Sequence, residues 1–211
     1  MGMSTLFESP DPSAAGRAPL NGLVLCVGRG TRLGRDKGAL DYHGRPQARW
    51  LFGLLQGFCA EVFVSVRADQ AGAATYRDLP SLQDPPDVQG PAAGLIAGWK
   101  RAPAAAWLLV AADLPLLDAR TLGVLVDARD PSADATAFRH PDGTPEPLCA
   151  IWEPRARPAV EAAPAASLRR VLEAGRVAFA VPPEPARLVS VNTPEDEARV
   201  RGRLAAPGTG F

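Results

Sequence analysis

Long apolar runs along this chain, each stopping at a polar or glycine-rich segment, predict the strands of a buried sheet. The run at 23–27 ends at a loop rich in glycine and arginine, and the run at 107–112 ends at Asp113. A third run, at 61–66, ends near Arg67. Continuous apolar strands of this length are typical of a parallel sheet that is covered on both faces.

Apolar residues at helical spacing follow the first of these runs. They recur every three or four positions behind Pro46, which suits a helix start, at Ala48, Leu51, Phe52, Leu55 and Phe58. The segment 68–89 contains adjacent prolines, so we expect it to be irregular, and 158–163 is a poor helix candidate.

Capping residues and further apolar runs complete the set of predicted elements. We expect two more strands, at 133–138 and 146–152, and four more helices, at 121–129, at 167–175, from 90 onward and from 194 onward.

Strands that alternate with helices predict an α/β fold: a three-layer α/β/α sandwich with a mostly parallel sheet, which binds ligands at the carboxyl ends of its strands. A chain of 211 residues fits one core. We expect residues 1–18 to form a flexible tail, 19–205 one domain and 206–211 a flexible end, with fraying from Gly202.

Composition excludes several classes of protein. The formal net charge is zero and the isoelectric point is about 6.7, whereas a nucleic-acid coat needs a broad basic excess. No apolar run is long enough to span a bilayer and no secretory signal begins the chain, so we expect a cytoplasmic protein without membrane contact. The two histidines and three cysteines lack metal-ligand spacing, and the cysteines Cys26, Cys59 and Cys149 read as buried thiols.

The loop after the first strand carries the candidate chemistry. Glycines let a backbone approach a ligand closely, and successive N–H groups can then cradle phosphate oxygens. Arginine grips phosphate bidentately, and lysine acts as a point charge. The loop combines these types at Gly28, Gly30, Gly34, Arg29, Arg32, Arg35 and Lys37. Its spacing is one residue too long for the dinucleotide motif G-x-G-x-x-G, and it does not match the P-loop.

Residues 25–37 resemble the L-A-G-G-x-S-x-R-M-G-x-D-K signature of the molybdenum cofactor guanylyltransferase family of nucleotidyltransferases. The positions compared are Leu25, Cys26, Val27, Gly28, Arg32, Leu33, Gly34, Asp36 and Lys37. In that family the loop wraps a triphosphate, which its lysine binds. The chain departs from the signature with Cys26-Val27 in place of Ala-Gly, and with Gly30 where serine is common. The β-branched Val27 disfavours the positive φ that glycine adopts.

Later segments resemble the family in the same order. Asp84 with Gly90, Pro91 and Gly94 is similar to its D…G-P-L-A-G block, which flanks the nucleotide. Asp113-Leu114-Pro115 resembles its D-x-P, whose aspartate holds Mg²⁺. Pro147-Leu148 and 190–196 resemble its acceptor-side segments, with Asn192 as the candidate contact and Ser190 where the family has asparagine. Without the resemblance, Asp113 could be a helix cap and Pro147 an edge-strand proline.

The resemblance implies a Rossmann-like nucleotide-diphospho-sugar transferase fold and Mg²⁺-dependent transfer of GMP from GTP to molybdopterin, with molybdoenzyme maturation proteins as further partners. The implied catalytic residues are Arg32, Lys37 and Asp113, with Asp113 as the metal ligand. The implied nucleotide contacts are Leu25, Cys26, Val27, Gly28, Gly30, Arg32, Lys37, Ser65, Asp84, Gly90, Pro91, Gly94 and Asp113, and the implied acceptor contacts are Pro147 and Asn192.

Two alternatives stay open, because the residues by themselves indicate only the binding of a nucleoside triphosphate with Mg²⁺. Ser65 and Val27 leave room for a related transferase that uses CTP or acts on a sugar phosphate. Val27 in the glycine loop also leaves room for a homologue that binds nucleotide without turnover.

Overall fold

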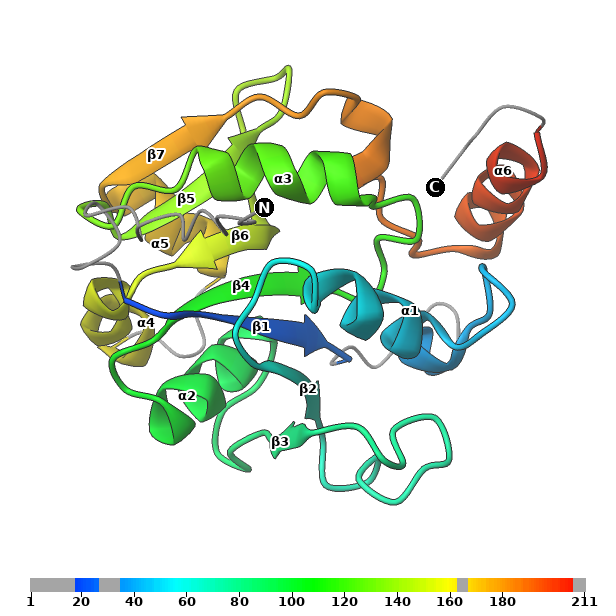
Figure 1. The fold of residues 1–211 in the computed structure, drawn as a ribbon, viewed down its shortest axis with the longest axis horizontal. Helices are drawn as coiled ribbons and strands as arrows, with labels where there is room; N and C mark the ends of the chain where they lie inside the picture. Colours follow the sequence, from blue (N-terminus) through cyan, green and yellow to red (C-terminus); the bar gives the residue numbers. More distant parts are fainter. Residues whose placement is uncertain (1–17, 27–34, 163–166, 207–211) are drawn as a thin grey trace, which may run out of the picture.

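The computed structural model describes residues 18–26, 35–162 and 167–206, and these contain one seven-stranded sheet (Figure 1). Its strand order is β3-β2-β1-β4-β6-β5-β7. The strands are β1 (Leu20–Leu25), β2 (Val62–Val66), β3 (Ser81–Gln83), β4 (Ala106–Ala111), β5 (Ala135–Arg139), β6 (Pro145–Trp152) and β7 (Val177–Ala180). Only the pairs that β6 makes with β4 and β5 are antiparallel, so this sheet is mostly parallel, as predicted.

Helices follow most of the strands. The α-helices are α1 (Gln47–Leu55), α2 (Pro91–Arg101), α3 (Ala119–Asp127), α4 (Arg157–Ala162), α5 (Leu168–Ala174) and α6 (Pro194–Ala205). The 3-10 helices are η2 (Lys37–Ala39), η3 (Pro154–Ala156) and η4 (Pro185–Leu188). No helix among the described ranges is both long and apolar enough to cross a membrane.

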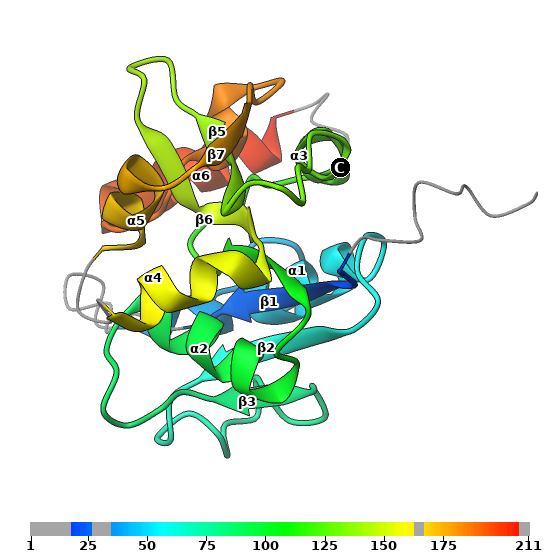
Figure 2. The same cartoon turned by 90° about the vertical axis from the view of Figure 1, so that its left-hand side faces the viewer.

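Helices cover both faces of the sheet, which confirms the predicted three-layer sandwich. One apolar core lies between the sheet and helices α1 and α3, with Leu51 and Leu122 among its members. A second core lies between the opposite face and helices α2, α4 and α5, around Trp99 and Trp107. Figure 2 shows the sheet between these two groups of helices. The continuous apolar runs of β1 and β4 are therefore buried on both sides.

Several predicted boundaries were wrong, for local reasons. The segment 68–89 is not wholly irregular, because β3 pairs with β2 over three residues, too few to show a period in sequence. The region 158–163 does contain a helix, α4, since Pro158 lies in its first turn, where no N–H partner is needed, and Val160 is buried. Helix α6 continues past Gly202 to Ala205, and β7, at the sheet edge, was not predicted.

Helix α3 begins two residues earlier than predicted because of its cap. The Asp118 carboxylate accepts a hydrogen bond of 2.8 Å from the backbone N–H of Thr121 and so caps the helix. The alternative interpretation of Asp113 as the cap of this helix was therefore wrong, and Asp113 is left for another role.

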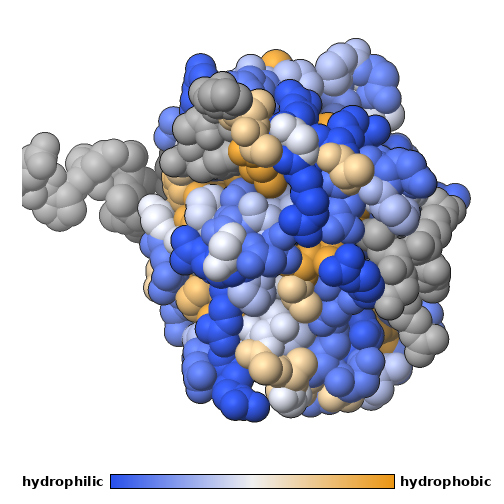
Figure 3. Space-filling model, turned by 90° about the vertical axis from the view of Figure 1, so that its right-hand side faces the viewer, coloured by the Kyte–Doolittle hydropathy of each residue, from blue (hydrophilic) through white to orange (hydrophobic). Residues whose placement is uncertain are grey.

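The carboxyl ends of β1 and β4 lie at the same edge of the sheet, and segments distant in sequence converge there. β6 runs antiparallel to β4, so its amino-terminal residues reach this edge too. Figure 1 shows α6 beyond this edge, apart from the helices that cover the sheet. Figure 3 views the molecule from this side, where the surface is largely hydrophilic with a small hydrophobic area near its centre.

Candidate nucleotide-binding site

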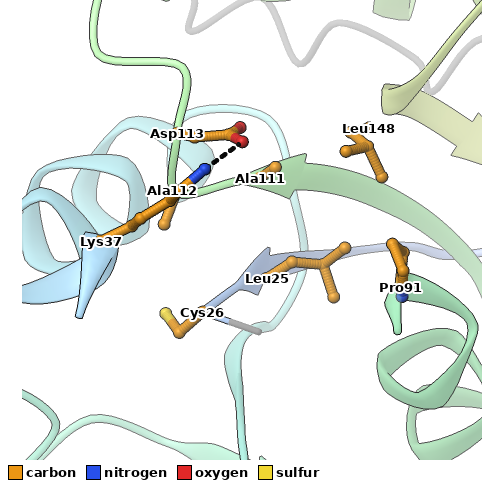
Figure 4. Close-up of a pocket in the computed structure, with 8 residues that line it drawn as sticks. All are labelled: Leu25, Cys26, Lys37, Pro91, Ala111, Ala112, Asp113 and Leu148. Atoms are coloured by element: carbon orange, nitrogen blue, oxygen red, sulfur yellow. Dashed lines mark hydrogen bonds and ion pairs between the residues drawn. The ribbon is translucent and has the colours of Figure 1, made fainter. Parts of the chain in front are cut away.

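A pocket opens at this edge of the sheet (Figure 4). It is lined by residues from β1, β4, η2, α2 and β6 and from the segments directly after β1 and β4: Leu25, Cys26, Lys37, Pro91, Ala111, Ala112, Asp113 and Leu148. Parallel strands of an open α/β sheet bind ligands at their carboxyl ends, which is where this pocket lies. Of the residues proposed from sequence, Leu25, Cys26, Lys37, Pro91 and Asp113 thus share one pocket.

Lys37 is the charged centre of the pocket. Its Nζ donates hydrogen bonds to Oδ2 of Asp113 at 3.0 Å and to Oδ1 of Asn192 at 2.7 Å. The side chains of Lys37 and Asp113 are 15% and 14% exposed, so the ion pair is largely shielded from water. Three residues spread over 155 positions of sequence therefore meet at one amine.

The start of α6 holds Asn192 in place. Thr193 and Asp196 form a capping box, and the Asp196 carboxylate also accepts from the backbone N–H of Asn192 at 3.1 Å. This bond is the main reason that the pKa of Asp196 lies below its ordinary value. The backbone N–H of Val191 donates to the carbonyl of Asp113 at 2.9 Å. The segment before α6 is thus tied directly to the end of β4.

Asp84 forms a second carboxylate position beside β2. The Ser65 hydroxyl donates a hydrogen bond of 2.5 Å to Oδ1 of Asp84. Burial raises the pKa of Asp84, while this hydrogen bond and the nearby Arg67 guanidinium oppose the rise. Ser65 itself is fully buried, and the nucleotide contact proposed for it from sequence stays a prediction. Its hydroxyl orients the carboxylate.

Two glycines bring the start of α2 close to the pocket. Gly90 has a φ of 78°, a conformation that favours glycine, immediately before the first helical residue Pro91. A Cβ at Gly94 would lie 2.5 Å from Leu25 Cδ2 and 2.7 Å from Ser65 Oγ. The missing side chain at Gly94 therefore lets α2 pack directly on β1 and β2.

We expect Gly94→Ala to destabilise the protein by about 1–3 kcal/mol, the usual cost of overpacking a core. The added methyl must also displace Ser65, so the orientation of Asp84 should change. Thermal unfolding measures the first effect, with Gly53→Ala as the control: Gly53 lies in α1, and a Cβ there has no neighbour within 4 Å. Gly53→Ala should be neutral or stabilising; equal loss in both variants would contradict the close-packing role of Gly94.

Pro147 lies in an irregular part of β6. The pairing with β5 passes from Ala137 with Ala150 to Phe138 with Glu146, so residues 147–149 of β6 have no partner in β5. A proline is tolerated there because the ladder needs no N–H from it. Pro147 is buried, and its neighbour Leu148 lines the pocket. Leu148 is thus the residue of this pair that lines the pocket, and the acceptor contact proposed for Pro147 stays a prediction.

Four predicted contacts lie outside the described residues: Val27, Gly28, Gly30 and Arg32. The chain is described again from Arg35, and Asp36 there is fastened to Gln70 and Tyr76 by hydrogen bonds. The sequence interpretation missed Gln70 and Tyr76, since it treated their segment as loop. Both residues lie in the segment between β2 and β3, where no period or motif in the sequence marks them.

The pocket offers one side chain suited to a divalent cation. Oδ1 of Asp113 is buried and has no hydrogen-bond partner among the described residues, and a bound cation would satisfy it. Neither in the pocket nor elsewhere in the described ranges are three His, Cys, Asp or Glu side chains grouped so as to hold a metal. A lone carboxylate fits Mg²⁺, which is commonly held by one or two carboxylates and substrate phosphates.

Residues 22–179 match the family model of the MobA-like NTP transferase domain. The molybdenum cofactor guanylyltransferase of Pseudomonas fluorescens SBW25 is 34% identical over 183 residues, which are 84% of this chain and 91% of that protein. The molybdenum cofactor biosynthesis bifunctional protein of Synechocystis is 29% identical over 188 residues, 87% of this chain. This match covers 54% of the Synechocystis protein, so the chain spans about half the length of that relative.

Solved structures show the same fold. The molybdopterin-guanine dinucleotide biosynthesis protein A of Archaeoglobus fulgidus superposes with a TM-score of 0.73 and 20% identity, over 87% of this chain and 97% of that one. The nucleotidyl transferase of Methanothermobacter has a TM-score of 0.68 at 18% identity, over 88% and 97% of the two chains. At these identities the likeness extends to the fold alone.

Proposed function

Since this chain belongs to the MobA-like NTP transferase family and is therefore a nucleotidyltransferase, we propose that it transfers GMP from GTP to molybdopterin and releases pyrophosphate. The observation that carries the proposal is the convergence of Lys37, Asp113 and Asn192 at one pocket at the carboxyl ends of β1 and β4. The guanylyltransferase relatives support the choice of GTP and molybdopterin.

In the proposed reaction the terminal phosphate of molybdopterin attacks the α-phosphate of GTP. A new phosphorus–oxygen bond forms, the bond to the bridging oxygen between the α- and β-phosphates breaks, and pyrophosphate leaves. This chemistry requires the positioning of phosphates and the neutralisation of charge more than covalent catalysis. Lys37, together with Arg32 and the loop glycines, would hold the triphosphate, and Asn192 would face the acceptor.

Lys37 has to change partners for this role. In the structure its amine is bonded to Asp113 and Asn192, and a bound triphosphate would offer it oxygens that carry more negative charge. Release of Lys37 frees Oδ2 of Asp113 as well. Nucleotide and metal binding would then be coupled, because the Lys37 ammonium, which neutralises Asp113 in the structure, would move to the phosphates.

Asp113 would hold the divalent cation that the family generally uses. We propose that this cation is Mg²⁺. When bound, such a cation neutralises charge on the triphosphate and on the leaving pyrophosphate. The assignment is supported by Oδ1 of Asp113, which is buried and has no hydrogen-bond partner among the residues that the structure describes.

Asp84 would recognise the base, with Gly90 and Pro91 at the start of α2 beside it. An ionised carboxylate only accepts hydrogen bonds, and guanine presents two adjacent donors, N1–H and the 2-amino group. Cytosine presents one amino donor. The orientation of Asp84 by Ser65 at 2.5 Å supports such a two-bond contact.

Guanosine affinity should fall as the pH is lowered, and the fall should begin at a higher pH than the titration of an ordinary aspartate would give. The pKa of Asp84 is raised by burial, and protonation on the way down in pH removes one acceptor from the carboxyl. Ser65→Ala removes the bond that opposes the rise, so the loss of affinity should move to still higher pH. Calorimetry of guanosine binding against pH measures this. Ser132→Ala is the control, since Ser132 bonds to the exposed Asp130, and a shared shift would contradict the role of Asp84.

Calorimetric titration of the protein with GTP, CTP and NADPH, each with and without Mg²⁺, tests the proposal. Tight, magnesium-dependent binding of GTP would support it, and molybdopterin-dependent release of pyrophosphate from GTP would complete the test. Preference for CTP would favour the related transferase. Binding of GTP without turnover would favour a non-catalytic homologue.

The partners of the product and the domain boundaries are proposed separately from the reaction. Molybdoenzyme maturation proteins would receive the product, and the boundaries at 18 and 206 stay predictions that limited proteolysis can check.

A further inference from the structure

A buried cluster of hydrogen bonds lies beside the pocket and is not accounted for by the proposed chemistry. The Tyr76 hydroxyl lies 2.7 and 2.8 Å from the two carboxylate oxygens of Asp36. Nε2 of Gln70 donates to Oδ2 of Asp36 at 3.1 Å and to the carbonyl of Cys26 at 3.3 Å. Tyr76 and Gln70 are 3% and 5% exposed, so water competes little for these bonds.

Tyr76 is suited to be a permanent donor in this cluster. Burial, the neighbouring Cys26 and the hydrogen bond to Asp36 together raise the pKa of the Tyr76 hydroxyl far above its ordinary value. The phenol therefore keeps its proton throughout the physiological range. Asp36, which has no proton to give when ionised, is held by one fixed donor from each of Tyr76 and Gln70.

The cluster acts on the residue next to Asp36, which is Lys37. Oδ1 of Asp36 also accepts from the backbone N–H of Gly38 at 2.9 Å and so caps the 3-10 turn η2, which begins at Lys37. A Cβ at Gly38 would lie 2.5 Å from the Tyr76 hydroxyl oxygen. The turn therefore packs directly on Tyr76, and the direction in which Lys37 leaves it depends on this contact.

The same cluster is joined to the strand that carries the base-side residues. Oε1 of Gln70 accepts from the backbone N–H of Arg67 at 3.1 Å, and the backbone N–H of Cys26 donates to the carbonyl of Ser65 at 3.2 Å. Ser65 orients Asp84. A short path of hydrogen bonds thus connects the carboxylate proposed to bind the base with the turn that presents Lys37.

We propose that Tyr76, Asp36 and Gln70 form a clamp that positions Lys37 for the triphosphate, at a set distance from the base-binding Asp84. These three are positioning residues, because none of them lines the pocket. The inference rests on the proposed role of Lys37 in phosphate binding. It assigns a function to the segment after β2, whose only regular element before α2 is β3.

Chemical labelling tests the clamp without any ligand. Lys37 and Lys100 are the only lysines in the sequence, and Lys100 is exposed on α2. Reductive methylation, measured by mass spectrometry, therefore compares the hydrogen-bonded amine of Lys37 with the exposed amine of Lys100 in the same molecule. In Tyr76→Phe the ratio of Lys37 to Lys100 labelling should rise about tenfold, the effect of losing one hydrogen bond to a charged group.

Tyr42→Phe is the matched control, since Tyr42 is the other tyrosine of the chain. Its hydroxyl is buried and has no hydrogen-bond partner in the described part of the chain. The labelling ratio should not change in this variant. An equal rise in both variants, or no rise in Tyr76→Phe, would overturn the clamp.

Binding of inorganic tripolyphosphate and of guanosine supplies a second readout. Tyr76→Phe should weaken tripolyphosphate binding about tenfold and change guanosine binding less than about twofold. In a Lys37→Ala background, Tyr76→Phe should have no further effect on tripolyphosphate, because the clamp acts through Lys37. Additive losses, or equal losses for both ligands, would mean that Tyr76 serves stability alone.

Should Tyr76→Phe fail to fold, Asp36→Asn replaces it. The amide keeps one oxygen for Gly38 and Tyr76 but turns an N–H₂ group toward Gln70, so a smaller change in the same direction is expected, and no change would overturn the clamp. A wild-type protein that binds tripolyphosphate but not GTP would refute the proposed function while leaving the clamp testable by labelling.

Discussion

Asp113→Asn should reduce the rate of guanylyl transfer by about a thousandfold or more, because the variant lacks the charge that holds the divalent cation against the triphosphate. The amide has nearly the same shape as the carboxylate, so packing beside Ala112 and Leu114 is preserved. Pyrophosphate release, measured over a range of Mg²⁺ concentrations, checks the prediction. Direct binding of Mn²⁺ to the protein with GTP, followed by electron paramagnetic resonance, should show a parallel loss.

The fold should survive this change. Asp113 is largely shielded from water and paired with Lys37, but its Oδ1 is already without a partner in the described part of the structure. Because the substitution also removes the ion-pair partner of the shielded Lys37, stability should fall by about 1–3 kcal/mol, as in Lys37→Ala, which is less than the stability of a typical domain. Asp118→Asn serves as the control, since Asp118 follows the same strand but caps α3. Full activity in Asp113→Asn, with unchanged Mn²⁺ binding, would remove Asp113 as the metal ligand.

Lys37→Ala should weaken GTP binding about a hundredfold, while guanosine binding changes less than about threefold, because truncation of one partner in a charged contact costs several kcal/mol. The alanine cannot reach the phosphates. Calorimetry with GTP, GDP, GMP and guanosine would show how the loss grows with each phosphate. Equal losses for GTP and guanosine would place Lys37 away from the triphosphate.

A second consequence of Lys37→Ala concerns Asp113. The carboxylate would lose its 3.0 Å ion pair and remain mostly buried, so stability should fall by about 1–3 kcal/mol. Without nucleotide, the variant should bind a divalent cation more tightly than the wild type does, since Lys37 no longer neutralises the site. Lys100→Ala, which removes the exposed lysine of α2, should change neither property.

Sequence reasoning succeeded where local pattern and tertiary burial agree. β1, β2 and β4 are buried on both faces, so their continuous apolar runs identify them without knowledge of their neighbours. Helix α5 was predicted correctly because Ser167 and Gly175 mark its ends. β3 and β7 were missed because they are edge strands of three and four residues, and their pairing depends on a neighbour that is distant in sequence.

The site divides in the same way. The resemblance of residues 25–37 and 113–115 to a known signature was enough to select Lys37 and Asp113, because their chemistry is local to each motif. Their 3.0 Å contact depends on η2 and β4 meeting at one edge of the sheet. That the buried Ser65 hydroxyl bonds to Asp84 likewise depends on the folded chain, and the nucleotide contact proposed for Ser65 stays a prediction.

By itself the sequence determined the α/β class, the order of the main strands and helices, and the residue types that suit a triphosphate. Each of these follows from apolar periodicity or from the chemistry of a short segment. Only the tertiary structure decided that Asn192 shares Lys37 with Asp113, and that Tyr76 and Gln70 hold Asp36. Those contacts join segments 34 to 155 residues apart. No period or motif in the chain marks such a contact, because it forms only when the folded sheet brings the two segments to the same edge.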